Sequence, residues 1–308
     1  MHVITGSQLR TYHSFFEENM NDLFIIKNLR CSYDKDYKDG ISKVILEIKS
    51  LNIPRGKKVF IVGESGIGKS TILETLGMMN NTLVEDDNTQ FVFFEDGGKS
   101  LDLKALWAKS DAELSAFRLK HFSFIFQSTN LMRNFTAYEN IALTRMLQGY
   151  SRASSFEKAA TILADLGLGH IDSTRMTQEL SGGQQQRLAF ARAILPDFTV
   201  LFGDEPTGNL DSDNAIKAIE LLTNKLSEME NSSAIIVSHD MRLAITFADV
   251  IIKIRKESRI LSQVSDEISY YGVIDDRCVY TRDSKTSDWT NGEDSYSDIN
   301  FELYLKKC

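Results

Sequence analysis

The sequence predicts an α/β fold with a mainly parallel β-sheet at its core. Two observations support this prediction: short runs that are apolar on both faces, and segments of helical periodicity between them. The apolar runs lie at 59–62, 124–126, 200–202 and 234–237, and each is followed by polar or glycine-rich residues. Strands buried on both faces are typical of parallel sheets, because helices cover both sides of such a sheet.

The helices are expected between these strands, at about 69–79, 138–149, 155–167, 183–195 and 213–229. Pro54, Pro196 and Pro206 lie just outside the proposed elements, as the missing N–H of proline requires. Hydrophobic residues make up 42% of the chain and charged residues 25%, which is ordinary for a globular protein with a core.

Composition excludes several classes of protein. The formal net charge of −8 argues against a protein held mainly by nucleic-acid phosphates. No apolar run is long enough for a membrane-spanning helix, and the first residues do not resemble a secretory signal. Cys31, Cys278 and Cys308 lack the spacing of a zinc site or a disulfide framework, so a reducing compartment is expected.

A glycine-rich loop follows the first apolar run and fits the pattern G-x-x-x-x-G-K-[ST]. Its glycines let backbone N–H groups turn toward phosphate oxygens, and the N-terminus of the next helix adds partial positive charge. Lys69 would reach the β- and γ-phosphates, and the Ser70 hydroxyl would bind Mg²⁺. The alternative is a plain glycine turn between a strand and a helix. The loop contains Gly63, Glu64, Ser65, Gly66, Ile67, Gly68, Lys69, Ser70 and Thr71.

A second glycine motif, at 180–187, reads LSGGQQQR. Ser181 is placed to cap the helix that follows, while Gly182 and Gly183 leave the helix N-terminus open to an anion. Taken alone, the motif could equally be an ordinary capped helix start.

Two carboxylates, Asp204 and Glu205, end the strand that begins at about 199. Neighbouring strand residues point to opposite faces, so the two acids can serve different purposes. Asp204 suits the water shell of Mg²⁺, and Glu205 suits an attacking water. A surface turn is the competing interpretation. Gln127 and His239 also follow strands, and each gains weight only as part of this set.

Together these residues resemble the nucleotide-binding subunit of an ABC transporter over about residues 23–262. The matching segments are Walker A (63–71), the Q-loop (Gln127), the signature (180–187), Walker B (200–205), the D-loop (209–211) and the H-loop (His239). The segments 111–118, 134–140 and 203–211 resemble the branch that contains LolD, MacB and FtsE, whose members act in lipoprotein release, macrolide efflux or cell division.

The resemblance implies a P-loop NTPase of ABC type, with an antiparallel β subdomain and a helical insert at about 128–180. It implies that ATP and Mg²⁺ are the cofactors, and that the chain hydrolyses ATP. Catalysis would involve Glu205, His239, Gln127 and Lys69, and Mg²⁺ would be held by Ser70, Gln127 and Asp204. Outside Walker A, nucleotide contacts would come from Tyr33, Ser181, Gly182, Gly183, Gln184 and Asp211; Tyr37 is an open alternative to Tyr33 as the adenine-stacking residue.

In the family, two subunits meet head to tail, and each ATP lies between Walker A of one and the signature of the other. The expected partners are therefore a second copy or a paralogous ATPase subunit, and an integral-membrane permease; no nucleic acid is expected. The location would be cytoplasmic, peripheral on the inner face of the cell membrane. Two alternatives are a soluble ABC-type ATPase that acts on nucleic acid or ribosomes, and a non-hydrolysing regulatory subunit.

The ends of the chain are expected to be appendages. Residues 1–22 form an N-terminal extension, 23–262 form the ATPase domain, and 263–308 form an acidic C-terminal tail with ten acidic and five basic residues. The tail is interpreted as a strand pair with a frayed end or as a partner-binding segment, and its removal should change hydrolysis only a few-fold. Leu131, Met132 and Phe135 are expected to contact the permease, unless they form a local core.

Overall fold

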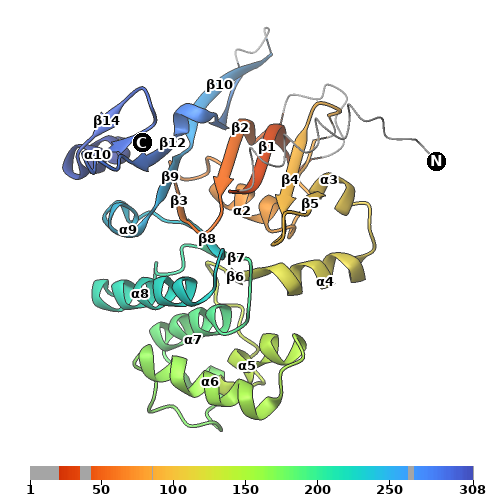
Figure 1. Ribbon diagram of the computed structural model, residues 1–308, viewed down its shortest axis with the longest axis vertical. Helices are drawn as coiled ribbons and strands as arrows, with labels where there is room; N and C mark the ends of the chain where they lie inside the picture. The colour runs from red at the N-terminus through yellow and green to blue at the C-terminus, as the bar shows by residue number, and fades with distance from the viewer. Residues whose placement is uncertain (1–20, 35–42, 85, 263–266, 308) are drawn as a thin grey trace.

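The computed structural model describes residues 21–34, 43–84, 86–262 and 267–307. Two β-sheets and the helices around them make up the described part (Figure 1). Nearly all of the expected N-terminal extension lies outside these residues, and so does Tyr37.

The central sheet has the strand order β14-β13-β12-β9-β3-β8-β7-β6. From β9 to β6, every neighbouring pair is parallel. The four apolar runs are confirmed as strands of this parallel part, each within a residue or two of the expected bounds. These four strands are β3 (Lys58–Val62), β6 (Phe122–Ile125), β7 (Val200–Asp204) and β8 (Ser233–Val237), and the fifth strand of the parallel part is β9 (Val250–Lys253).

The second sheet has the order β10-β11-β2-β1-β4-β5. Its strand β1 pairs antiparallel with both β2 and β4, so this sheet is the antiparallel subdomain that the resemblance implies. The strand β11, by contrast, runs parallel to β2. The bounds are β1 (Asp22–Cys31), β2 (Leu46–Pro54), β4 (Gln90–Phe94), β5 (Ser100–Asp102), β10 (Arg255–Ser262) and β11 (Glu267–Ile274).

The five expected helices are present, and most begin at a side-chain cap. Thr136 and Ser181 each form a reciprocal capping box, with Glu139 and Gln184. None of the described helices is long and apolar enough to cross a membrane. Their bounds are α2 (Lys69–Leu76), α3 (Leu103–Leu106), α4 (Asp111–His121), α5 (Ala137–Leu147), α6 (Arg152–Asp165), α7 (Gly182–Ile194), α8 (Ser212–Glu228) and α9 (Met241–Phe247).

The central sheet separates two apolar cores, and β3 contributes to both. Val59 and Ile61 belong to the core shared with the second sheet and α2. Phe60 and Val62 belong to the core shared with α5, α6, α7 and α8. Alternate strand residues point to opposite faces, so one buried strand can serve two layers. The helices α5, α6 and α7 form the helical region at the bottom of Figure 1.

The chain after 274 continues the central sheet. The strand β12 (Val279–Arg282) pairs antiparallel with β9, and β13 (Trp289–Thr290), β14 (Ser295–Tyr296) and α10 (Asp298–Lys306) follow it. We call residues 279–306 the C-terminal module. Tyr280, Trp289 and Phe301 are at most 1% exposed in it, although the sequence predicts an acidic tail here.

Candidate functional site

The loop between β3 and α2 has the backbone of a phosphate-binding site. Gly66 and Gly68 have φ of 76° and 102°, in the left-handed region that favours glycine. Gly68 is the N-cap of α2 and provides no side-chain hydrogen bond, and the first turn of α2 contains no acidic residue. The N–H groups of that turn therefore have no capping side chain, so an anion can accept from them.

Lys69 lies inside this loop and is 6% exposed. Its Nζ donates to the carbonyl oxygens of Gly63 (2.8 Å) and Glu64 (2.7 Å), which uses two of the three ammonium donors. Burial lowers the pKa of Lys69, and the nearby carboxylates of Glu205 and Asp204 oppose that shift. The positive charge is therefore held within the loop, beside the first turn of α2.

Ser70 and Asp204 bring two oxygen donors together at the ends of α2 and β7. Burial raises the pKa of Asp204, and Glu205 raises it further, while a hydrogen bond with the Ser70 side chain acts in the opposite direction. A hydroxyl and a carboxylate are ligand types that Mg²⁺ prefers, and a cation would offset the cost of burying this carboxylate. The residues present therefore fit Mg²⁺. In the described part of the chain, no group of three or more His, Cys, Asp or Glu gathers into a metal site of their own.

Glu205 and His239 form a close pair. His239 Nε2 lies 2.7 Å from Glu205 Oε1, and the two residues come from the ends of the neighbouring strands β7 and β8. Glu205 has φ of 49°, an uncommon conformation for a non-glycine residue that often marks a functional site. Its backbone is fixed by a hydrogen bond to Val237 O (3.0 Å) and by one from Gly208 N (3.1 Å).

Gln127 and Tyr33 lie at the borders of this group. The strands β6 and β7 are parallel neighbours, so Gln127 and Glu205 both follow the carboxyl-terminal ends of adjacent strands, and the Gln127 side chain is exposed. The Tyr33 hydroxyl lies 3.2 Å from Thr71 Oγ1 and donates to Glu74 Oε2 (3.0 Å) on α2. Its ring is about half exposed, at 51%.

The signature residues Ser181 to Gln184 lie elsewhere, at the N-terminus of α7. Ser181 Oγ accepts from Gln184 N (3.3 Å), and Gln184 Oε1 accepts from Ser181 N (2.9 Å), so the expected capping role of Ser181 is present. In Figure 1, α7 lies with the helical region, and α2 lies on the opposite side of the central sheet. The two glycine motifs therefore do not face one another within one chain.

Polar residues that the sequence analysis did not single out connect α7 to Walker B and the D-loop. The buried Gln186 donates to Pro206 O (3.1 Å), directly after Glu205. Arg187 donates to Asn214 Oδ1 (3.1 Å), and Asn214 Nδ2 donates to Asp211 Oδ2 (2.7 Å). Asp211 itself caps α8. Gln186 and Arg187 lie inside the signature, and Asn214 lies just after the D-loop. Their positions in the sequence could have marked them as candidates, but no spacing rule predicts which atoms they contact.

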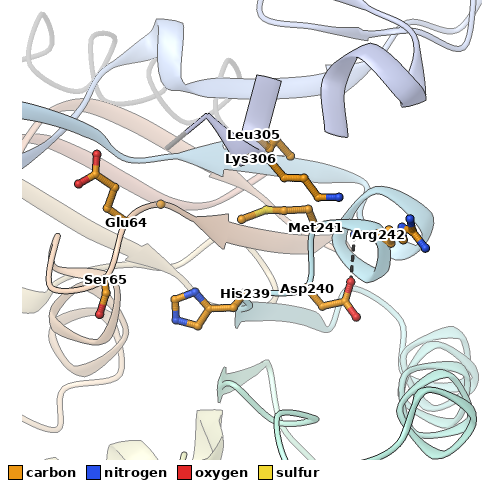
Figure 2. Close-up of a pocket in the computed structure, with 9 residues that line it drawn as sticks. Glu64, Ser65, His239, Asp240, Met241, Arg242, Leu305 and Lys306 are labelled. Carbon is orange, nitrogen blue, oxygen red and sulfur yellow. Dashed lines mark hydrogen bonds between the residues drawn. The ribbon is translucent and has the colours of Figure 1, made fainter. Parts of the chain in front are cut away.

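A pocket of about 540 Å³ opens beside the Walker A loop and His239 (Figure 2). Its walls come from three segments: the start of Walker A, the H-loop with the first residues of α9, and the end of α10. The last of these was not expected, because α10 belongs to the predicted tail. The lining residues are Gly63, Glu64, Ser65, His239, Asp240, Met241, Arg242, Leu305 and Lys306.

Comparison with known proteins finds relatives that all belong to ABC transporters. The sequence model of the family described as ABC transporter matches residues 46–208. The lipoprotein-releasing system ATP-binding protein LolD of Pseudoalteromonas translucida is 37% identical over 227 residues, or 73% of this chain and 90% of that protein. The macrolide export ATP-binding/permease protein MacB of Campylobacter fetus is 38% identical over 232 residues, or 75% of this chain and 34% of that protein.

Solved structures agree with these relatives. The dimeric structure of MJ0796, a bacterial ABC transporter cassette, has a TM-score of 0.61 and 30% identity, and covers 75% of this chain and 94% of that one. A second structure of that cassette is a post-hydrolysis state bound to ADP and phosphate, with a TM-score of 0.61 and 29% identity over the same shares of the two chains. The chain therefore belongs to the ABC transporter family and is an ATP hydrolase with LolD and MacB among its relatives.

Proposed function

We propose that this chain hydrolyses ATP as a head-to-tail dimer and thereby drives a separate integral-membrane subunit. The observation that supports the dimer is the division of the site within one chain. One part of the site lies at the carboxyl-terminal ends of the central strands. It contains Lys69, Ser70, Asp204, Glu205 and His239. The signature lies at the N-terminus of α7, in the helical region. A second copy, or a paralogous subunit, would bring its residues 181–184 to the phosphates.

We assign the roles of the residues from the family resemblance and from their positions. Lys69 and the first turn of α2 hold the β- and γ-phosphates, and Tyr33 stacks on adenine. Ser70, Asp204 and Gln127 would hold Mg²⁺, which would supply positive charge to the phosphate oxygens. Glu205 orients the attacking water and accepts its proton, because its carboxylate pairs with His239. His239 keeps Glu205 in place and contacts the γ-phosphate.

The permease is expected to dock on the segment after the Q-loop. Met132 is 44% exposed there, which suits a contact with an apolar partner surface. Leu131 packs against the apolar core beside the helical region, so it serves the fold. Phe135 is partly buried, and its carbonyl accepts from Thr177 Oγ1 (2.8 Å). Met132 is therefore the residue of this segment that we assign to docking.

The names of the relatives indicate which kinds of transport process the ATPase could drive. One is part of a lipoprotein-releasing system, and the other combines an ATP-binding part with a permease for macrolide export. We infer a role in export, lipoprotein release or mechanotransmission, with the chain placed in the cytoplasm against the inner face of the cell membrane. The net charge of −8 agrees with a partner other than nucleic acid.

The decisive experiment uses Glu205→Gln, which keeps the shape of the side chain but removes the basic carboxylate. ATP should bind and remain, so the variant should elute as an ATP-dependent dimer and lose about 10²-fold or more of the hydrolysis rate. Lys69→Ala is the control that should give no ATP-dependent dimer. Normal hydrolysis by Glu205→Gln would show that the assigned role is wrong.

The membrane part of the proposal is tested on the same protein. Affinity capture of Glu205→Gln from detergent-solubilised membranes should recover a multi-span protein in the presence of ATP. Adding Met132→Lys should abolish that recovery and leave the dimer intact. Leu303→Lys is the matched control, because Leu303 is similarly exposed (56%) but lies on α10. Recovery that survives Met132→Lys would contradict the docking assignment.

A further inference from the structure

The short helix α9 is joined directly to His239. It begins two residues after His239, and Asp240 caps it by accepting from Arg242 N and Leu243 N, both at 3.0 Å. Figure 2 shows Asp240 and Arg242 joined in this way beside the His239 ring. Because the cap residue Asp240 directly follows His239, a change in the direction of α9 moves the histidine.

The other end of α9 is held by the C-terminal module. Arg282, on β12, donates from its guanidinium to the carbonyl of Ile245 (2.8 Å). That carbonyl lies in the last turn of α9, where carbonyls have no partner within the helix. A cation at this end also interacts favourably with the helix dipole. Arg282 in turn forms an ion pair with Asp298 at the start of α10 (3.0 Å) and lies over the Trp289 ring.

A second contact joins the first turn of α9 to α10. Arg242 Nε donates to Glu302 Oε1 (3.1 Å), and Lys306 also binds this oxygen (2.5 Å). The Arg242 side chain is 80% exposed, so solvent screens the pair and its contribution to stability is small. The pair connects the first turn of α9 to α10.

Apolar packing completes the connection. Phe301 and Leu305 of α10 belong to the same buried core as Leu243 and Ile245 of α9. In Figure 2, Leu305 and Lys306 also lie across the pocket from Glu64 and Ser65. The module thus contacts α9 at its start, along its buried side and at its end, and also forms one wall beside the nucleotide loop.

From these contacts we infer that the C-terminal module positions His239 for ATP hydrolysis, with Arg282 and Glu302 as positioning residues. The module fixes α9, α9 fixes the H-loop, and the H-loop holds His239 Nε2 2.7 Å from Glu205 Oε1. The inference rests on the proposed role of His239 in hydrolysis. It adds that this chain uses residues after 274, which lie after every nucleotide motif in the sequence, to position the pair of His239 and Glu205.

The test measures kcat, the KM for ATP and thermal stability of the full chain. Arg282→Ala should lower kcat about tenfold, as expected for a lost charge-assisted hydrogen bond. Glu302→Ala and Arg242→Ala should each lower it about two- to fivefold, as befits an exposed pair. The KM for ATP should stay within about twofold, because the phosphate-binding loop is unchanged.

Glu302→Gln keeps an acceptor oxygen and should retain most activity. Arg277→Ala is the matched control, since Arg277 forms its ion pair with Asp275, before the module in the chain, and its substitution should leave kcat unchanged.

A double-variant comparison separates positioning from general damage. If Arg282 and Glu302 act through His239, neither substitution should lower kcat further in a His239→Ala background. An equal further loss in that background, or an unchanged kcat in folded Arg282→Ala and Glu302→Ala, would overturn the inference. If Arg282→Ala does not fold, the Glu302 and Arg242 variants decide alone. Full activity of His239→Ala itself would instead refute the proposed role of His239, so the two failures are distinguishable.

Discussion

Asp204 and Glu205 place two carboxyl groups at the end of one partly buried strand, where each affects the other. Burial is the main cause that raises the pKa of Asp204, and the charge on Glu205 adds to it. A raised pKa means that the folded protein disfavours the ionised form. Ionisation of Asp204 therefore costs folding free energy above its folded pKa, and this cost disappears below its ordinary pKa, where both states are protonated. In the proposed function, this cost has a use, because the ionised Asp204 carboxylate would bind Mg²⁺.

Asp204→Asn should therefore stabilise the nucleotide-free protein while it abolishes Mg²⁺-dependent hydrolysis. The amide oxygen can still accept from Ser70, and the repulsion with Glu205 is removed. Calorimetry should show a Tm raised by about 2–4 °C at neutral pH, the shift for roughly 1 kcal/mol. The gain should shrink as the pH falls through the raised pKa of Asp204 toward the ordinary value of an aspartate, because the wild-type carboxyl then becomes protonated. Asp87→Asn, at an exposed carboxyl, is the control and should leave Tm unchanged. A lower Tm for Asp204→Asn would contradict the interpretation.

Residues with a motif spacing could be predicted, and residues that act through tertiary contacts could not. The P-loop pattern identified Lys69 and Ser70, because phosphate binding requires those types at that spacing. The 2.7 Å approach of His239 to Glu205 joins a histidine that is a weak candidate alone to a carboxylate that the strand-end pattern already indicates. Arg282 and Glu302 had no comparable signal, since their partners on α9 lie 37 and 60 positions away in sequence.

At the scale of elements, the hairpin of β10 and β11 packs against the Walker A loop. Lys256 on β10 forms an ion pair with Glu64 (2.6 Å). On β11, Gly272 donates its N–H to Ile45 O (2.8 Å), and a Cβ at this position would lie only 2.3 Å from Ile67 O. Ile67 is part of the loop, between the two glycines with positive φ. The hairpin thus fits against the loop only because residue 272 has no side chain.

Gly272→Ala should therefore disturb nucleotide binding more than a typical surface change. The atom it would strike is a backbone carbonyl, which cannot move away as a flexible side chain can, so the loop itself must shift. We expect a tenfold or greater rise in the ATP dissociation constant, together with the roughly 1–3 kcal/mol cost of overpacking. Nucleotide titration and thermal unfolding measure the two effects. Ser269→Ala on the same strand is the control.

A second variant keeps that test specific to the loop. The new Cβ would also lie 2.8 Å from Ile254 Cγ2. Ile254→Val keeps that atom position and Ile254→Ala removes it, but neither relieves the clash with Ile67 O. Full recovery of ATP affinity by Ile254→Ala in the Gly272→Ala protein would place the clash in the side-chain core and contradict the loop interpretation.

Elements were predictable where periodicity is local. The runs at 59–62 and 234–237 are apolar on both faces, and β3 and β8 are buried parallel strands, as that pattern predicts. The strands β11 and β12 mix polar and apolar residues. Their partners are distant in the chain: β11 pairs with β2, and β12 pairs with β9 although β10 and β11 lie between them in sequence. A strand whose partner is chosen by tertiary packing leaves little trace in its own sequence.

For the whole molecule, the C-terminal module determines where the central sheet ends. With β12 in place, β9 is paired on both sides, by β3 and by β12. The acidic composition of 263–308 pointed to a tail because it averages over exposed loops and a few large buried rings. Those rings are spaced 9 to 12 residues apart, at Tyr280, Trp289 and Phe301, and they meet only after the chain turns back at α10.

This arrangement changes the expectation for a truncated chain. The sequence alone predicts that removal of 263–308 changes hydrolysis only a few-fold. The structure gives the opposite expectation for removal of everything after 275, since it would expose one edge of β9 and the apolar side of α9. We expect a protein that aggregates, or that melts more than about 10 °C lower, in line with the several kcal/mol contributed by buried aromatic residues. Trp289→Ala tests the same packing without a truncation, and Ile299→Ala is its control because Ile299 is 76% exposed on α10. A truncated chain that stays folded, keeps its Tm and hydrolyses ATP normally would restore the boundary at 262 and remove the basis for a positioning role of the module.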